Sequence, residues 1–127
     1  MKRLVCACAL LIAGCGGGAG DLLSITASGG PAPARHTIVV SGDGRGSCDQ
    51  GPLKEVPSDR VIDARAVERD AADLAKRSAT YPPSTNAREY TLRTKAGTVR
   101  WSAGRPGLPS VLPRAELLSL QLQRILC

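Results

Sequence analysis

The chain has 127 residues, 43% of them hydrophobic, and a formal net charge of +6 at neutral pH. This length supports one small domain and excludes two, because each would have too few residues to bury a core. Phenylalanine is absent and the aromatic residues are one tryptophan and two tyrosines, so we expect a thin core of Leu, Val, Ile and Ala.

The first 14 residues have the features of an export signal. Met1 to Arg3 is positively charged, Leu4 to Ile12 is apolar, and small residues follow. The apolar run is too short to span a bilayer, which takes roughly 20 helical residues. Ile12-Ala13-Gly14-Cys15 resembles the lipobox of bacterial lipoproteins, which implies cleavage between Gly14 and Cys15, a diacylglycerol thioether on Cys15 and a further acyl chain. The alternative is an ordinary secretory signal that is cut elsewhere.

A glycine-rich tether over residues 15–21 leads into a single domain over residues 22–127. Two or three acyl chains, each stabilised by ~0.8 kcal/mol per buried CH₂, hold a protein stably on a membrane. We therefore expect the mature chain to be anchored through Cys15 on the extracytoplasmic side of the bacterial cell envelope.

The cysteines indicate a disulfide in this compartment. Cys6 and Cys8 leave with the signal and Cys15 is lipidated, so Cys48 and Cys127 remain as a pair. A bond between them would close a long loop and stabilise the thin core. Two free thiols, or an intermolecular bond through Cys127, are the alternatives.

The first half of the domain contains signals for strands and then for a helix. Residues 22–27 predict a strand that ends at the loop 29–33, and residues 37–40 and 45–48 predict a hairpin around the turn 41–44. From residue 63 to residue 78, apolar side chains recur every three or four positions. This pattern predicts an amphipathic helix with Asp63 as its N-cap.

The second half repeats this order. Apolar residues alternate with polar ones around Lys95-Ala96-Gly97, at Tyr90, Leu92, Val99 and Trp101, which predicts a second hairpin. Pro113 suits the first turn of a last helix, whose expected apolar stripe is Leu118, Leu122 and Ile125. Each element has one apolar side, so we predict an α+β fold: an antiparallel sheet of two hairpins plus an N-terminal strand, packed on one face by two helices.

The sequence carries no motif for catalysis, metal binding or a cofactor. His36 is the single histidine, and no Cys, His or carboxylate cluster has metal-ligand spacing around it. The chain has no Gly-x-Ser-x-Gly elbow, and the glycine-rich stretch 42–47 lacks the lysine of a phosphate-binding loop. We expect a protein without catalytic residues, a metal or a cofactor.

Basic residues are concentrated after residue 75. If the apolar side chains of the second hairpin face the helices, Arg93, Lys95 and Arg100 share its solvent face. Such a basic face suits anionic lipid headgroups or an acidic protein partner. Nucleic acid is not an expected partner, because export removes the chain from it and the face lacks aromatic residues that stack on bases.

Several short segments form a pattern: the strand before Gly29-Gly30, the helix ending in Leu74-Ala75, Glu89-Tyr90-Thr91-Leu92 with Gly97, and the ending from Leu108-Pro109 through Leu117-Leu118-Ser119-Leu120 to Ile125-Leu126. In these segments the chain resembles emfourin-like proteins, small bacterial inhibitors of thermolysin-type metallopeptidases. The resemblance implies that exposed loops such as Gly29 to Arg35 fill a protease cleft, which makes Gly29, Gly30 and Arg35 candidate partner residues.

These features together predict a lipid-anchored, non-catalytic envelope protein that binds another protein. Inhibition of an extracytoplasmic metallopeptidase is the sharpest version of this hypothesis. The alternative is a structural or accessory envelope lipoprotein whose basic sheet face contacts anionic lipid.

Overall fold

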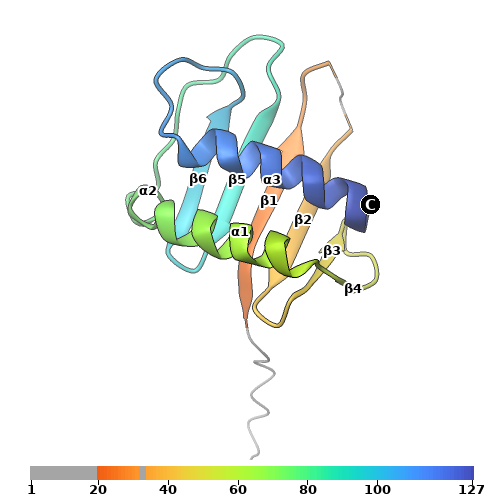
Figure 1. The fold of residues 1–127 in the computed structure, drawn as a ribbon. Coiled ribbons are helices and arrows are strands. Elements are labelled where there is room, and N and C mark those ends of the chain that lie inside the picture. The colour runs from red at the N-terminus through yellow and green to blue at the C-terminus, as the bar shows by residue number, and fades with distance from the viewer. Residues whose placement is uncertain (1–19, 32–33) are drawn as a thin grey trace, which may run out of the picture.

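The computed structural model describes residues 20–31 and 34–127, in which helices cover one face of an antiparallel sheet (Figure 1). Within these residues the sheet has six strands, in the spatial order β4-β3-β2-β1-β5-β6. The strands are β1 (Asp21–Ser28), β2 (His36–Ser41), β3 (Arg45–Cys48), β4 (Lys54–Glu55), β5 (Glu89–Thr94) and β6 (Gly97–Ser102). The predicted α+β class is confirmed, and the short edge strand β4 is an addition to it.

The N-terminal strand β1 lies in the middle of the sheet and joins the two hairpins. It pairs antiparallel with β2 on one side and with β5 on the other. Its alternate residues Leu23, Ile25 and Ala27 are fully buried under the helices. From Ser24 to Ala27 the strand is paired on both edges, so β1 links the two hairpins in the core of the domain.

The first helix, α1 (Ser58–Asp70), begins five residues earlier than the sequence predicts. It starts directly after Pro57, whose carbonyl accepts the backbone N–H groups of Arg60 and Val61 at 2.9 and 3.1 Å. Asp63 is therefore not the N-cap; it lies inside the helix, where Arg60 Nη1 donates to its Oδ2 at 2.7 Å. The expectation is wrong because the first turn is polar and gives no periodic apolar signal.

The helical segment is interrupted at Ala71 and continues as α2 (Ala72–Lys76). α2 packs against the turn between β5 and β6, where Gly97 has a φ of +143°. A Cβ atom at Gly97 would overlap the backbone carbonyl oxygen of Ala75. Glycine is therefore needed at this turn both for its backbone conformation and for the close approach of the helix.

The last helix, α3 (Val111–Leu126), packs beside α1 over the sheet (Figure 1). Its large buried aliphatic residues are Leu112, Leu118, Leu122 and Leu126. The prediction that Ile125 belongs to the apolar stripe is wrong, since Ile125 is 36% exposed and its neighbour Leu126 is buried. Gly46 of β3 is the reason: a Cβ there would lie 2.9 Å from Leu126 Cδ1, so the missing side chain leaves room for Leu126.

An aromatic pair fills the part of the core beside β5 and β6. Tyr90 and Trp101 face each other across β5 and β6, with their rings stacked at a centroid distance of 5.5 Å. Trp101 is buried, and its Nε1 donates to Glu116 Oε1 of α3 at 2.9 Å. This hydrogen bond satisfies the polar atom of the largest side chain in the core.

A disulfide between Cys48 and Cys127 ties the end of β3 to the residue after α3. The predicted intramolecular bond is therefore confirmed. The cysteines are 79 residues apart in the sequence. In the chain-entropy description, closing such a loop contributes about 4.5 kcal/mol to stability.

Candidate functional site

The sheet face turned away from the helices is polar and rich in hydroxyl groups. In Figure 1 the helices lie in front of the sheet, so this open face is turned away from the viewer. Strand register places Thr37, Thr26, Thr91 and Arg100 side by side across β2, β1, β5 and β6. The next row pairs Ser24 with Arg93. Because side chains alternate along a strand, these residues point away from the buried positions.

Seven residues of this face surround a shallow hollow of about 290 Å³. They are Ser24, Thr26, Arg35, Thr37, Thr91, Arg93 and Arg100. Every one carries a hydroxyl or a guanidinium group, and none is acidic. Thr26 and Thr37 share a hydrogen bond between their hydroxyl oxygens at 3.1 Å.

The arginines of the hollow, Arg35, Arg93 and Arg100, form no ion pair within the described residues. The backbone N–H of Thr37, then the ring of His36 and the charges of His36 and Arg35, hold the pKa of Asp49 below the usual range. Arg35 is therefore partly balanced by Asp49, whereas Arg93 and Arg100 present positive charge that no ion pair within the described residues neutralises.

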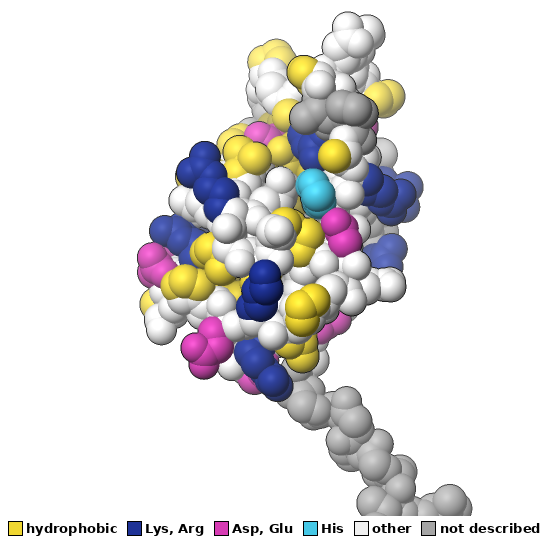
Figure 2. All heavy atoms as spheres, turned by 90° about the vertical axis from the view of Figure 1, so that its right-hand side faces the viewer, with side chains coloured by type: hydrophobic (Ala, Val, Ile, Leu, Met, Phe, Trp, Pro, Cys, Tyr) yellow, Lys and Arg dark blue, Asp and Glu magenta, His cyan; other side chains and the backbone are white. Residues whose placement is uncertain are grey.

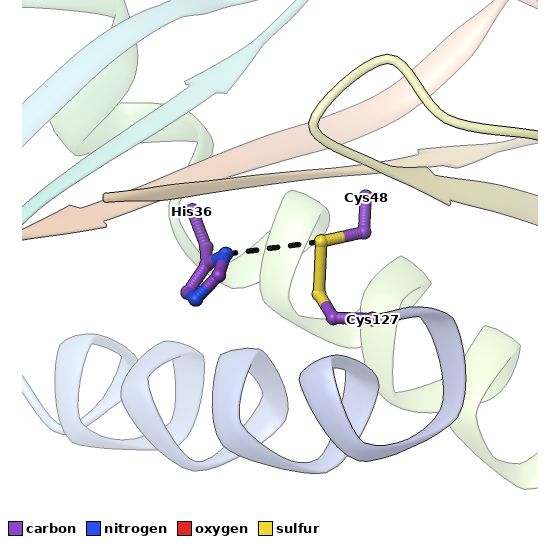
Figure 3. A group of neighbouring side chains, drawn as sticks. All are labelled: His36, Cys48 and Cys127. Atoms are coloured by element: carbon purple, nitrogen blue, oxygen red, sulfur yellow. Dashed lines mark hydrogen bonds between the residues drawn. A yellow bond between two sulfur atoms is a disulfide. The ribbon is translucent and has the colours of Figure 1, made fainter. Parts of the chain in front are cut away.

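This arrangement suits the binding of oxygen anions. A guanidinium group offers five N–H donors in a planar fork that matches a carboxylate or phosphate, and hydroxyl groups can add further hydrogen bonds. The residues that line the hollow include no group that serves as a general base near neutral pH, since His36 lies on the helical side of the sheet (Figure 3). The groups that line the hollow are therefore able to recognise negative charge.

The structure separates the three predicted basic residues. Arg93 and Arg100 lie on the open face, but Lys95 does not, because its Nζ lies 3.5 Å from Glu68 Oε1 of α1 on the helical side. The expectation for Lys95 is corrected: it belongs to the turn, where the strict alternation of the strand ends. Arg35, which the sequence assigned to a partner loop, joins the two arginines in the hollow.

The hydroxyl row was not singled out from the sequence. The signal was present as threonine or serine at alternate positions of the predicted strands. What the sequence did not show is which strands are neighbours, and the row exists only because β1 lies between β2 and β5.

The loop that contains Gly29 and Gly30 lies at the end of the sheet opposite to residue 20 (Figure 1). Both glycines have positive φ angles, +74° and +70°. Arg88 holds this loop, since its Nη1 donates to Gly29 O at 3.1 Å and its Nη2 to Ala34 O at 2.9 Å. The loop therefore has a defined shape at both of its ends.

The predicted cleavage and lipidation residues, Gly14 and Cys15, lie outside the described residues. In the part of the chain that the structure describes, no helix has the length and apolar character needed to cross a membrane. β1 starts at the end of the sheet where the β2–β3 turn lies, and Gly42 N donates to Gly20 O there at 3.1 Å.

A second polar group lies at the end of β3, on the helical side of the sheet. His36, Cys48 and Cys127 each place one possible metal-binding atom within 4.8 Å of the others. Figure 2 shows the histidine at the surface with an acidic side chain beside it. The sequence prediction of no metal-ligand cluster missed this group, because its members are distant in the chain and meet only through strand pairing and the disulfide.

No protein-family model, no curated protein and no solved structure matches this chain. The similarities to bacterial lipoproteins and to emfourin-like inhibitors therefore rest on the residues quoted above and stay predictions. The geometry of the open face is the basis on which a function can be argued.

Proposed function

We propose that this chain is a lipid-anchored, non-catalytic protein of the bacterial cell envelope that binds an acidic segment of another protein on its open sheet face. One observation carries the proposal: in the described residues, Arg35, Arg93 and Arg100 surround a hydroxyl-lined hollow and make no ion pair. Carboxylates of a partner would supply the missing charge and would accept hydrogen bonds from the arginines and from the threonine hydroxyl groups.

The composition of the open face favours a protein partner over a lipid surface. Peripheral membrane binding combines positive charge with apolar side chains that enter the headgroup layer. The large hydrophobic residues that are most exposed in the described chain are Leu53, Ile62, Leu117, Leu120 and Ile125, and none belongs to a strand of the sheet. The open face has charge and hydrogen-bonding groups without such anchors.

Binding of a fluorescein-labelled oligoglutamate peptide, followed by fluorescence anisotropy, tests the proposed face. We expect the double variant Arg93→Ala, Arg100→Ala to bind at least about tenfold more weakly, because hydrogen bonds to charged groups are worth about 1.5–3 kcal/mol. The matched control Arg77→Ala, Arg124→Ala removes the same charge from exposed positions on the helical side. Equal losses of peptide affinity in the two double variants would show that the effect depends on net charge alone and would contradict the proposal.

A second arm of this experiment uses vesicles of phosphatidylglycerol and phosphatidylcholine in a sedimentation assay. The proposal predicts weak vesicle binding that the two double variants share. Strong binding to the anionic vesicles that is lost in Arg93→Ala, Arg100→Ala, with no binding of the peptide, would indicate that the open face binds lipid and would contradict the proposal.

The lipobox supports the anchoring part of the proposal, and a separate experiment addresses it. In bacterial cells that process lipoproteins, the full chain should partition with membranes and the Cys15→Ala variant should not. Mass spectrometry of the mature N-terminal peptide should show an acylated cysteine. An unmodified Cys15 with residues 1–14 still attached would contradict the anchor without affecting the peptide-binding result.

Protease inhibition is a second candidate function, favoured by the loop at Gly29-Gly30. Arg88 holds the carbonyl groups on both sides of this loop, which reduces the entropy that an occluding loop would lose on binding. Excess purified chain should then inhibit a thermolysin-like peptidase, and Arg88→Ala should weaken the inhibition. Full peptidase activity in the presence of excess chain would remove this candidate.

A further inference from the structure

His36, Cys48 and Cys127 lie together at the end of β3 (Figure 3), and Asp49 lies beside them. His36 begins β2, Cys48 ends β3 and Cys127 follows α3. His36 Nδ1 lies 3.9 Å from Cys48 Sγ. Asp49 adds a carboxylate, whose Oδ2 is 2.9 Å from His36 Nδ1 and 3.6 Å from Cys48 Sγ.

The separations of His36 Nδ1 and Asp49 Oδ2 from Cys48 Sγ are close to those in a tetrahedral metal site. Bonds of ~2.0 Å to nitrogen or oxygen and ~2.3 Å to sulfur place neighbouring ligand atoms ~3.3–3.8 Å apart. The nitrogen–sulfur distance of 3.9 Å and the oxygen–sulfur distance of 3.6 Å agree with this geometry. The nitrogen–oxygen distance of 2.9 Å is that of a hydrogen bond and would lengthen when a metal replaces the shared proton.

We propose that reduction of the disulfide opens a site for one Zn²⁺ ion, with Cys48, Cys127, His36 and Asp49 as its ligands. Two thiolates, an imidazole and a carboxylate are a donor set that Zn²⁺ prefers. The sulfur atoms, ~2.05 Å apart in a disulfide, separate to ~3.8 Å in the metal site. Cys127 lies just beyond the end of α3, so this movement does not require the helix to shift.

Reduction of the disulfide and binding of Zn²⁺ can be written so that atoms and electrons balance. A dithiol reductant transfers two electrons and two protons to the disulfide and leaves as a disulfide itself. Zn²⁺ then displaces the protons of both thiols, and His36 coordinates as a neutral imidazole through a ring nitrogen. The side chains of His36 and Asp49 are 32% and 47% exposed, so an ion reaches the site from solvent.

The metal site and the disulfide make the same structural link. Both join the end of β3 to the end of α3, across which the sequence separation is 79 residues. Under this proposal the link has two interchangeable forms: covalent under oxidising conditions and metal-bound under reducing ones. This inference does not depend on the proposed function of the open face.

A metal titration of the reduced protein tests the proposal. The chain has five cysteines, so the parent protein is the full chain with Cys6, Cys8 and Cys15 replaced by serine. It is reduced with a phosphine under anaerobic conditions and titrated first with Co²⁺. We expect one Co²⁺ per chain, with thiolate-to-cobalt charge-transfer absorption and the strong visible bands of tetrahedral cobalt, and displacement by Zn²⁺. The oxidised protein should give none of these bands, and their absence from the reduced protein would overturn the proposal.

Three variants of this parent identify the ligands. We expect His36→Ala and Asp49→Asn each to weaken Zn²⁺ binding by roughly 10- to 100-fold in competition with a chromophoric chelator. Glu55→Gln, which neutralises an exposed carboxylate on β4, should leave the affinity unchanged. Circular dichroism of the oxidised variants checks that each one is folded. Unchanged affinity in either His36→Ala or Asp49→Asn would overturn the four-ligand site.

Discussion

The two faces of the sheet are built from the same strands but differ in almost every physical property. The helical face carries the aliphatic residues of β1, the stacked pair Tyr90 and Trp101, and the disulfide at its edge. The open face carries hydroxyl groups and three arginines without an ionic partner among the described residues.

From this difference we expect stability to depend on the helical face and recognition to depend on the open face. A thin core with a single tryptophan needs every buried contact, so substitutions on the helical face should change the free energy of unfolding. The arginines of the open face contribute no ion pair to the described fold, so substitutions there should change binding instead.

Trp101→Ala should have the largest effect. The side chain is 1% exposed, stacks on Tyr90 and donates to Glu116, so its removal leaves a cavity and an unpaired carboxylate oxygen. We expect a loss of about 3–5 kcal/mol in the free energy of unfolding. Urea denaturation of the oxidised chain measures this loss, and a loss below about 1 kcal/mol would show that the helical face is not the source of stability.

Gly97→Ala should destabilise the contact between the sheet and α2. The added Cβ meets the Ala75 carbonyl and the residue keeps a φ of +143°, so we expect a loss of about 1–3 kcal/mol. Gly104→Ala is the matched control, since Gly104 also has a positive φ but no atom within 4 Å of an added Cβ. Thermal unfolding should show a larger loss of stability for Gly97→Ala than for Gly104→Ala. Equal losses of stability would mean that backbone conformation alone, and not the contact with Ala75, causes the effect.

Asp70→Asn should have a smaller effect that depends on pH. Hydrogen bonds from Arg114 and then Arg69 hold the pKa of Asp70 below its usual range. A carboxyl with a lowered pKa in the folded state stabilises the fold above its unfolded pKa, and this contribution disappears as pH falls through the folded value. The variant should therefore be less stable than the parent at neutral pH and equal to it in strong acid.

The comparison of denaturation midpoints at neutral and acid pH checks this prediction. Asp73→Asn is the control, because Asp73 is a nearby exposed carboxylate that makes no ion pair within the described residues. A difference between parent and Asp70→Asn that persists in strong acid would exclude the ionised carboxylate as its cause.

The double variant Arg93→Ala, Arg100→Ala should have the smallest effect on stability. The side chains are exposed and make no ion pair within the described residues, so we expect a change within about 0.5 kcal/mol. Urea denaturation of the same preparation used for peptide binding measures it. A large loss of stability would mean that the open face also supports the fold.

Local patterns predicted the hairpins well and the helix boundaries less well. Alternation around Gly97 reports directly on a hairpin, because both strands and the turn are adjacent in the chain. The start of α1 at Ser58 and the burial of Leu126 in place of Ile125 had no such local signal. The start of α1 depends on a proline before a polar first turn. The burial of Leu126 depends on space that Gly46 leaves in a distant strand.

The apolar side of each strand and the positions of the tight turns could be predicted from the amino-acid sequence alone. Only the tertiary structure decided that β1 lies between the hairpins, that Arg35 meets Arg93 and Arg100, and that His36 and Asp49 lie beside the disulfide. The reason is physical: alternation and turn chemistry act between neighbours in the chain. Both candidate sites arise from contacts between strands and helices that are far apart in sequence, and these contacts follow from the packing of the whole domain.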